Sequence, residues 1–278
     1  MELTAPAPLP FHAAPSLALF GLEPVRALAE YAAMRRMDRT ALPSGDGHPV
    51  VIFPGLASSE RSLAPLVACC ADLGYATYDW GRGYNVGPRG DVDAWLAGLA
   101  AEIATIVRTH DRPATLVGWS LGGIYARELA KLMPRQVRQV VTLGTPFAGG
   151  GAGTRVGWLF QWLSGRSPSL DEALARRLRM PPPVPCTSIY SRGDGIVAWR
   201  ACLQSGCGAS HPTENVEVHG SHSGMGWNPH ALAVVADRLA QPATAWRPYV
   251  PAVAVAPYAP PARTVAAAAA LSPVASSR

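Results

Sequence analysis

The sequence predicts an α/β fold, in which helices cover both faces of a mostly parallel β-sheet. Short apolar runs of strand length alternate with longer amphipathic segments between residues 48 and 241. The short runs are apolar on both faces, which is typical of parallel strands that lie between two helical layers. The chain has 278 residues, of which 49% are hydrophobic, so it can bury a large core. We therefore expect one α/β domain over residues 48–241.

Residues 1–47 precede this domain as an N-terminal extension. Its first part is rich in Pro and Ala, and segment 17–37 then has the apolar pattern of one or two helices, interrupted near Gly21 and Pro24. We expect this segment to pack on the domain. A role at a membrane surface is the alternative, because the end of the segment is basic.

Six strands and several helices are expected within the domain. The strand-like runs lie at 49–55, 76–80, 114–119, 137–146, 185–194 and 214–222. The helical segments stop at Gly74, span 93–110 and 121–133, and end with a last helix near Gln241. Segment 148–184 is longer than a single crossover needs and is expected to insert helical sequence. Residues 242–278 are dominated by Pro and Ala and are predicted to form a disordered tail.

The basic charge of the chain does not indicate a nucleic-acid partner. The net charge is +5, but the Arg residues are scattered apart from a small cluster at Arg176, Arg177 and Arg179. No basic stripe is interleaved with aromatic residues, so the charge is interpreted as a solubility feature. The N-terminus lacks the pattern of a signal peptide, and no run of about 18 apolar residues predicts a transmembrane segment. A cytoplasmic location is expected, with peripheral membrane contact left open.

Five cysteines show no metal-like spacing. Cys69 and Cys70 fall on a predicted helix and are expected to be core thiols. Cys202 and Cys207 could pair in an oxidising compartment, and the sequence leaves that pairing open.

Ser120 is the candidate nucleophile. It ends the apolar run "ATLVGW" and immediately precedes a helix, at a junction where the two backbones crowd together. Gly118 and Gly122 have the minimal side chains that such a turn needs, and Gly123 allows the helix to pack closely on the sheet. The turn raises the hydroxyl above the sheet edge, and the helix N-terminus favours developing negative charge. The alternatives are a tight connection whose serine has no role and a phosphate-binding turn, but the glycine pattern or lysine of a nucleotide-binding loop is absent.

A serine hydroxyl needs a general base and an acid that orients the base, and in this architecture they follow in the order Ser, acid, His. Asp194, flanked by glycines in "SRGDGIV", is the candidate acid, with a plain turn aspartate as the alternative. His219 continues the strand pattern after Val218 and is interpreted as a partly buried strand residue. His222 lies beyond Gly220 in a loop from which its ring can reach over the sheet, so we favour His222 as the base. The remaining histidines lie in tails, helix ends or other loops and are expected at the surface: His12, His48, His110, His211 and His230.

Two backbone N–H groups are the candidate donors of an oxyanion hole, in which each donor contributes about 10²–10³ in rate. Leu121 follows the nucleophile at the start of the helix. Leu56 follows Gly55 in the loop "FPGLASSE" after the first strand.

The motifs "GWSLGG", "LGTPFAG", "SRGDGIV" and "GSHSGMG", in this order and spacing, resemble the α/β-hydrolase superfamily. Among its members the chain looks most like the bacterial lipase and esterase branch, over roughly residues 48–241. The resemblance implies a three-layer α/β-hydrolase fold. Lipases of this type usually carry His-Gly after the first strand, whereas Pro54 precedes Gly55 here, so the oxyanion loop is expected to be set differently.

The resemblance also places segment 148–184 as a small helical cap or lid. Its Trp158, Phe160 and Trp162 are then candidates for lining an acyl pocket, together with Trp119. The alternative is that the cap aromatics form the core of the cap itself.

The predicted activity is hydrolysis of a small carboxylic ester or other acyl substrate through an acyl-enzyme, with Ser120, Asp194 and His222 as a triad and no metal or organic cofactor. A thioesterase, an acyltransferase or a perhydrolase on the same triad is the alternative within enzymes. From a different class, the chain could be a hydrolase-like binding protein with an inert site.

Overall fold

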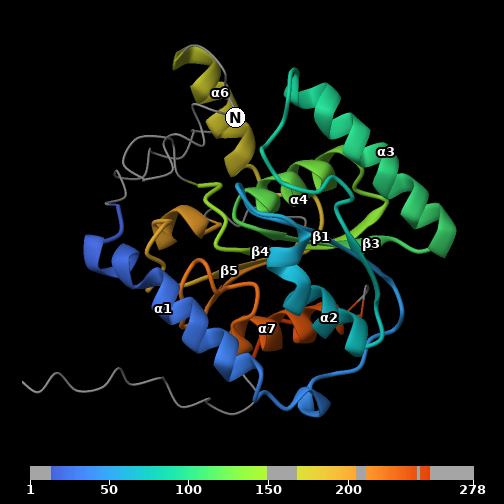
Figure 1. Ribbon diagram of the computed structural model, residues 1–278. Coiled ribbons are helices and arrows are strands. Elements are labelled where there is room, and N and C mark those ends of the chain that lie inside the picture. The colour runs from blue at the N-terminus through green and yellow to red at the C-terminus, as the bar shows by residue number, and fades with distance from the viewer. Residues whose placement is uncertain (1–13, 149–167, 205–210, 243–244, 251–278) are drawn as a thin grey trace, which may run out of the picture.

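The sheet is built from six parallel strands. The computed structural model describes residues 14–148, 168–204, 211–242 and 245–250 (Figure 1). Within these ranges the strands lie in the order β2-β1-β3-β4-β5-β6, and every pairing is parallel. Their bounds are β1 (Pro49–Phe53), β2 (Ala76–Asp79), β3 (Ala114–Trp119), β4 (Val137–Leu143), β5 (Cys186–Tyr190) and β6 (Thr213–Glu217). All six carboxyl ends therefore lie at one edge of the sheet, where ligands bind in open α/β folds.

Helices cover both faces, as the sequence predicts, and the fold has three layers (Figure 1). One face carries α3 (Val92–His110), α4 (Leu121–Leu132) and α6 (Pro168–Arg179), and the other carries α1 (Leu17–Met34), α2 (Ala64–Asp72) and α7 (Pro229–Leu239). Three short 3₁₀ helices, η1 (Arg39–Ala41), η2 (Glu60–Leu63) and η3 (Trp199–Cys202), lie in the connections. No helix in the described part of the chain is long and apolar enough to cross a membrane.

The strands contribute side chains to two cores, one under each helical layer. Phe53 of β1 and Leu116 of β3 pack with α3 and α4, whereas Ile52 and Val117, next to them in sequence, pack with α2 and α7. This alternation is the period of a β-strand, and both sets of side chains are buried.

The cysteines agree with the sequence analysis where the structure describes them. Cys69 and Cys70 are buried thiols of α2, as predicted. Cys202 is also a free, buried thiol, and Cys207 lies outside the described residues.

Several strands end earlier than the sequence predicts. The apolar runs extend to residues 146, 194 and 222, but the paired strands end at Leu143, Tyr190 and Glu217. The residues in between leave the ladder and form loops around the edge of the sheet. Apolar periodicity cannot show this change, because the loops are largely buried as well.

The N-terminal segment forms one continuous helix, so the predicted interruption near Gly21 and Pro24 is wrong. Pro24 costs α1 one backbone hydrogen bond, but the helix continues because its inner face packs on the domain. Glu23, Ala27 and Met34 are the buried residues of that face. Packing on the domain is thereby confirmed.

The prediction of a surface position for His48 is also wrong. This side chain is fully buried just before β1, where its Nδ1 lies 2.5 Å from Asp46 Oδ1 and its Nε2 lies 2.8 Å from Thr115 Oγ1. The sequence shows a polar residue in a loop, and only the neighbouring strand β3 brings the partner that makes burial possible.

Most of the described part of the predicted cap is α6, which packs in the helical layer beside α4 (Figure 1). Arg177 of α6 bonds Glu128 of α4 and Asp93 of α3, at 2.6 Å in each case. Residues 149–167 of the cap segment lie outside the described residues, and with them Trp158, Phe160 and Trp162. Most of the predicted tail, 251–278, also lies outside them.

Candidate active site

Ser120 occupies a strained turn between β3 and α4. Its φ of 53° and ψ of −119° belong to the region that residues with side chains rarely adopt. Its N–H donates to the carbonyl oxygen of Leu143 at 2.8 Å, which anchors the turn to β4. Its hydroxyl makes no capping bond to α4. The backbone is thus tightly held while the hydroxyl is left available.

The glycines around Ser120 have the steric role that the sequence predicts. A Cβ added to Gly118 would overlap the backbone of Gly122, and one added to Gly122 would overlap the carbonyl oxygen of Phe53. A Cβ on Gly123 would overlap the side chain of Thr145, in the loop after β4. The strand, the helix and the β1 loop (residues 54–58) can meet here only because these side chains are missing.

Asp194 and His222 are in direct contact. The acid loop (residues 191–198) follows β5 and the histidine loop (residues 218–228) follows β6, and they bring Asp194 Oδ2 to 2.7 Å from His222 Nδ1. The other carboxylate oxygen of Asp194 accepts the N–H groups of Ile196 at 2.8 Å and Val197 at 2.6 Å. Both side chains are buried. The carboxylate therefore has its orientation fixed by its own loop and points one oxygen at the imidazole.

The surroundings of His222 favour its protonated form. Burial alone would lower the pKa of His222, but the charge and hydrogen bond of Asp194, together with the charge of Glu23, raise it above the usual histidine value. The ring packs over Gly144, where an added Cβ would lie 3.0 Å from Nδ1. An imidazole whose pKa is raised by a buried carboxylate is well suited to accept a proton.

The predicted position of His219 in a partly buried strand is wrong, because β6 ends at Glu217 and the side chain of His219 is exposed.

Trp119 connects the two parts of the site. Its backbone leads into Ser120, and its indole N–H donates to the carbonyl oxygen of His222 at 3.1 Å. Among the described residues, no hydrogen bond joins the Ser120 hydroxyl to His222.

The β1 loop lies against the candidate nucleophile. A Cβ added to Gly55 would come within 3.2 Å of Ser120 Cβ, so the loop touches the turn directly. Leu56 follows in this loop and Leu121 is the first residue of α4, which puts both candidate oxyanion donors next to Ser120. Neither N–H has an acceptor among the described residues.

Two buried side chains that the sequence analysis did not select support these loops. Asn85 is fully buried; its amide nitrogen donates to the carbonyl oxygen of Pro54 at 2.8 Å, and its backbone bonds Ala57 and Ser58. Glu23 of α1 accepts hydrogen bonds from both the acid loop and the histidine loop. The only signal in the sequence is that Glu23 interrupts the apolar pattern of its helix.

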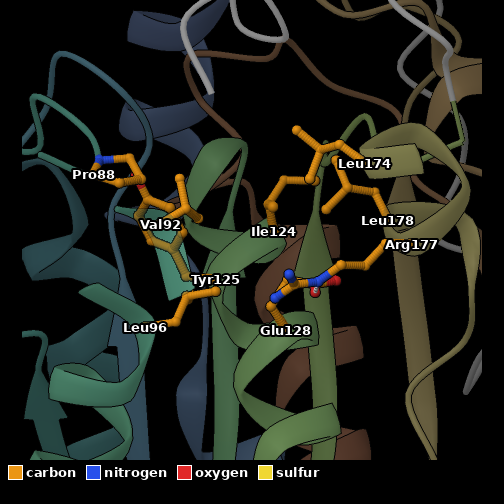
Figure 2. A pocket seen from close by; sticks show the side chains of 9 residues that line it. All are labelled: Pro88, Val92, Leu96, Ile124, Tyr125, Glu128, Leu174, Arg177 and Leu178. Carbon is orange, nitrogen blue, oxygen red and sulfur yellow. Dashed lines mark hydrogen bonds and ion pairs between the residues drawn. The ribbon is translucent and has the colours of Figure 1, made fainter. Parts of the chain in front are cut away.

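A small apolar cavity lies between α3, α4 and α6, and Ser120 is not among the residues that line it (Figure 2). Its volume is about 20 Å³, which is enough for about one water molecule. Figure 2 shows the side chains around it, among them Tyr125, Leu174 and Leu178. It is a packing gap under α6 and is too small for an acyl chain. Of the predicted pocket residues, the structure describes Trp119, which is half-buried beside His222.

Within the described part of the chain, no three His, Cys, Asp or Glu side chains are grouped as metal ligands would be.

Solved structures share the fold over most of their length. A metagenome-derived lipolytic enzyme matches with a TM-score of 0.52 at 15% identity, over 71% of this chain and 93% of that one. A monoacylglycerol lipase from Paleococcus ferrophilus matches with a TM-score of 0.51 at 15% identity, over 72% and 96%. The mouse α/β hydrolase domain-containing protein 10 matches with a TM-score of 0.50 at 18% identity, over 73% and 96%.

One curated protein is similar at the level of sequence. A pimeloyl-[acyl-carrier protein] methyl ester esterase from Shewanella woodyi is 30% identical over 102 residues, or 36% of this chain. The alignment spans 37% of that esterase. No family model matches the chain.

Proposed function

Because the chain has the α/β-hydrolase fold, we propose that it is a serine hydrolase that cleaves carboxylic esters, with Ser120 as nucleophile, His222 as base and Asp194 as orienting acid. The observation that carries this proposal is the 2.7 Å contact between the buried Asp194 and His222. It lies at the same sheet edge as a serine whose backbone is held at a φ of 53°. Strain that the surrounding structure maintains is typical of functional sites.

In the first step, the Ser120 hydroxyl attacks the ester carbonyl carbon while His222 Nε2 takes the hydroxyl proton. Asp194 keeps the other ring nitrogen protonated, so that Nε2 is the atom with a free lone pair. The carbonyl oxygen becomes an oxyanion, which the N–H groups of Leu56 and Leu121 stabilise. The carbon–oxygen bond to the alcohol then breaks, the alcohol leaves with the proton from His222, and the acyl group stays on Ser120.

In the second step, water repeats the attack. His222 takes a proton from the water, the new oxygen–carbon bond forms, and the same two N–H groups hold the second oxyanion. The bond to Ser120 then breaks, Ser120 recovers its proton from His222, and the carboxylic acid is released.

The partial match to a curated esterase supports an ester as the substrate and an acyl chain as its acid part. The solved lipolytic structures support the fold on which such a site is built. Thioester hydrolysis and acyl transfer use the same three side chains, so they remain the second candidates. Transfer to an alcohol in preference to water would identify the acyltransferase.

The experiment is hydrolysis of 4-nitrophenyl esters from acetate to palmitate by the wild type, Ser120→Ala and His222→Ala. By analogy with other triads, each variant is expected to lower kcat by a factor on the order of 10⁶. His219→Ala is the matched control, because His219 is an exposed histidine three residues from His222, and it should retain wild-type kcat. Undiminished hydrolysis by Ser120→Ala would contradict the proposal, and absence of activity in the wild type on esters and thioesters alike would favour an inert binding protein.

A further inference from the structure

Helix α1, which precedes the region of family resemblance, holds both loops that carry the candidate acid and base. Three charged residues on one face of α1 make the contacts. Arg26 Nη1 donates to the carbonyl oxygen of Gly193 at 2.5 Å, and Glu30 accepts the N–H of Ser221 at 2.7 Å. Glu23 lies one turn before Arg26 and contacts both loops at once.

The carboxylate of Glu23 accepts three backbone N–H groups. Its Oε1 accepts the N–H of Gly195 at 2.8 Å and that of His222 at 3.0 Å, and its Oε2 accepts the N–H of Ser223 at 2.8 Å. The side chain is only 3% exposed. Gly195 directly follows Asp194, so one carboxylate joins the residue next to the acid to the backbone of the base.

The two loops are shaped to receive this helix. A Cβ added to Gly195 would lie 2.5 Å from the carbonyl oxygen of Leu19, and one added to Gly224 would overlap the carboxylate of Glu30. Gly195 in the motif "SRGDGIV" and Gly224 in the motif "GSHSGMG" therefore make room for α1. The helix is part of the site and not an appendage to it.

We propose that Glu23 is a positioning residue of the site, which holds the acid loop and the histidine loop in register and presents a fixed negative charge behind His222. This inference rests on the proposed hydrolase function. It concerns a side chain that touches neither substrate nor reacting atoms and acts through Asp194 and His222.

The electrostatics agree with this geometry. Burial would raise the pKa of Glu23, but its backbone donors more than offset that effect and lower it, so the group is ionised at neutral pH. Among the described residues, Asp194 bonds the His222 ring, Glu30 of α1 bonds the histidine loop at Ser221, and Arg26 of α1 bonds the acid loop at Gly193. Of the α1 carboxylates, Glu23 is the one whose charge raises the pKa of His222. When His222 takes a proton during acyl transfer, that charge stabilises the imidazolium.

The test compares Glu23→Gln with Glu23→Asp and with Glu30→Gln as the matched control on the same helix. In Glu23→Gln the charge is lost and an amide N–H₂ faces the N–H of Ser223. We expect kcat to fall about 10- to 100-fold, as a displaced catalytic group would cause, with KM almost unchanged. The acidic limb of the kcat/KM profile should move to lower pH, because His222 loses a stabilising charge. Glu30→Gln should leave the position of that limb unchanged.

Glu23→Asp distinguishes the effect of the negative charge from the effect of side-chain length. It also provides a test if Glu23→Gln does not fold. It keeps the charge but shortens the side chain by one methylene, so the acidic limb should stay near its wild-type pH while kcat falls. Wild-type kcat in Glu23→Asp, or a folded Glu23→Gln with wild-type kcat and an unmoved acidic limb, would overturn the proposal.

A second readout does not depend on turnover. In a Ser120→Ala background, the pH titration of the His222 Nδ1–H proton can be followed by NMR with and without Glu23→Gln. A lower His222 pKa in the double variant supports the role of Glu23 even if the ester hydrolase assignment fails. An unchanged titration overturns the role of Glu23 even if Ser120 proves to be the nucleophile.

Discussion

Replacing Asn85 with Ala would remove the side chain that holds the β1 loop beside Ser120. The amide of Asn85 donates to Pro54 O at 2.8 Å, and its oxygen accepts Gly87 N–H at 3.0 Å and Tyr125 O–H at 3.2 Å. The side chain is fully buried, so the variant leaves three polar groups without these partners in the interior. Each such group costs about 1–3 kcal/mol. Since water can enter the space and satisfy part of them, we expect a total loss of about 3–6 kcal/mol in the free energy of unfolding.

Urea unfolding followed by tryptophan fluorescence measures this loss. Tyr125→Phe removes one of the three bonds and should cost about 0.5–1.5 kcal/mol. Asn215→Ala is the matched control, because the Asn215 side chain is exposed and its two hydrogen bonds go to the backbone of Gln204. We expect only a small loss there.

The same variant tests the link between this loop and activity. If the loop positions the Leu56 N–H as an oxyanion donor, a folded Asn85→Ala should lose about 10²–10³ in kcat, whereas Asn215→Ala should lose none. A variant at Asn85 that unfolds within about 1 kcal/mol of the wild type and keeps its kcat would refute the reasoning.

Three further predictions concern single positions. Gly122→Ala should destabilise the fold by about 1–3 kcal/mol or more, because the new Cβ overlaps the carbonyl oxygen of Phe53; an unchanged unfolding midpoint in urea would contradict this. Asp194→Asn should lower kcat about 10⁴-fold at neutral pH, as in other triads, because the amide no longer fixes the tautomer of His222; steady-state ester hydrolysis checks it, and a loss of less than about tenfold would count against an orienting acid. Burial lowers the pKa of His48, so the unfolded chain binds the proton more readily than the folded chain does. The stability of the wild type relative to His48→Gln should therefore fall as the pH drops below the usual histidine pKa. Urea unfolding at several pH values measures this difference in stability, and a relative stability that increases on acidification would contradict the prediction.

The strands and the turn at Ser120 could be predicted because their causes are local. A buried parallel strand needs an apolar run on both faces, and the crowded turn needs glycine at positions 118 and 122. Asp194 and His222 could be selected in the same way, since each follows a strand whose carboxyl end must lie at the common edge.

The remaining features depend on contacts between distant parts of the chain. Glu23 and Gly195 are 172 residues apart, and His48 and Thr115 are 67 residues apart, so no local pattern reports either pair. Pro24 would end an isolated helix, but α1 continues through it because its inner face is packed on the domain. The sequence does not show where the strands end, because the loops that follow them are largely buried as well.

Covalent labelling by a fluorophosphonate, read by peptide mass spectrometry, tests the central claim most directly. The proposed mechanism predicts one adduct, on the peptide that contains Ser120, which is lost in Ser120→Ala and forms much more slowly in His222→Ala, while His219→Ala labels like the wild type. Equal labelling of the wild type and Ser120→Ala, or an adduct on another residue, would contradict the assignment of Ser120 as the nucleophile.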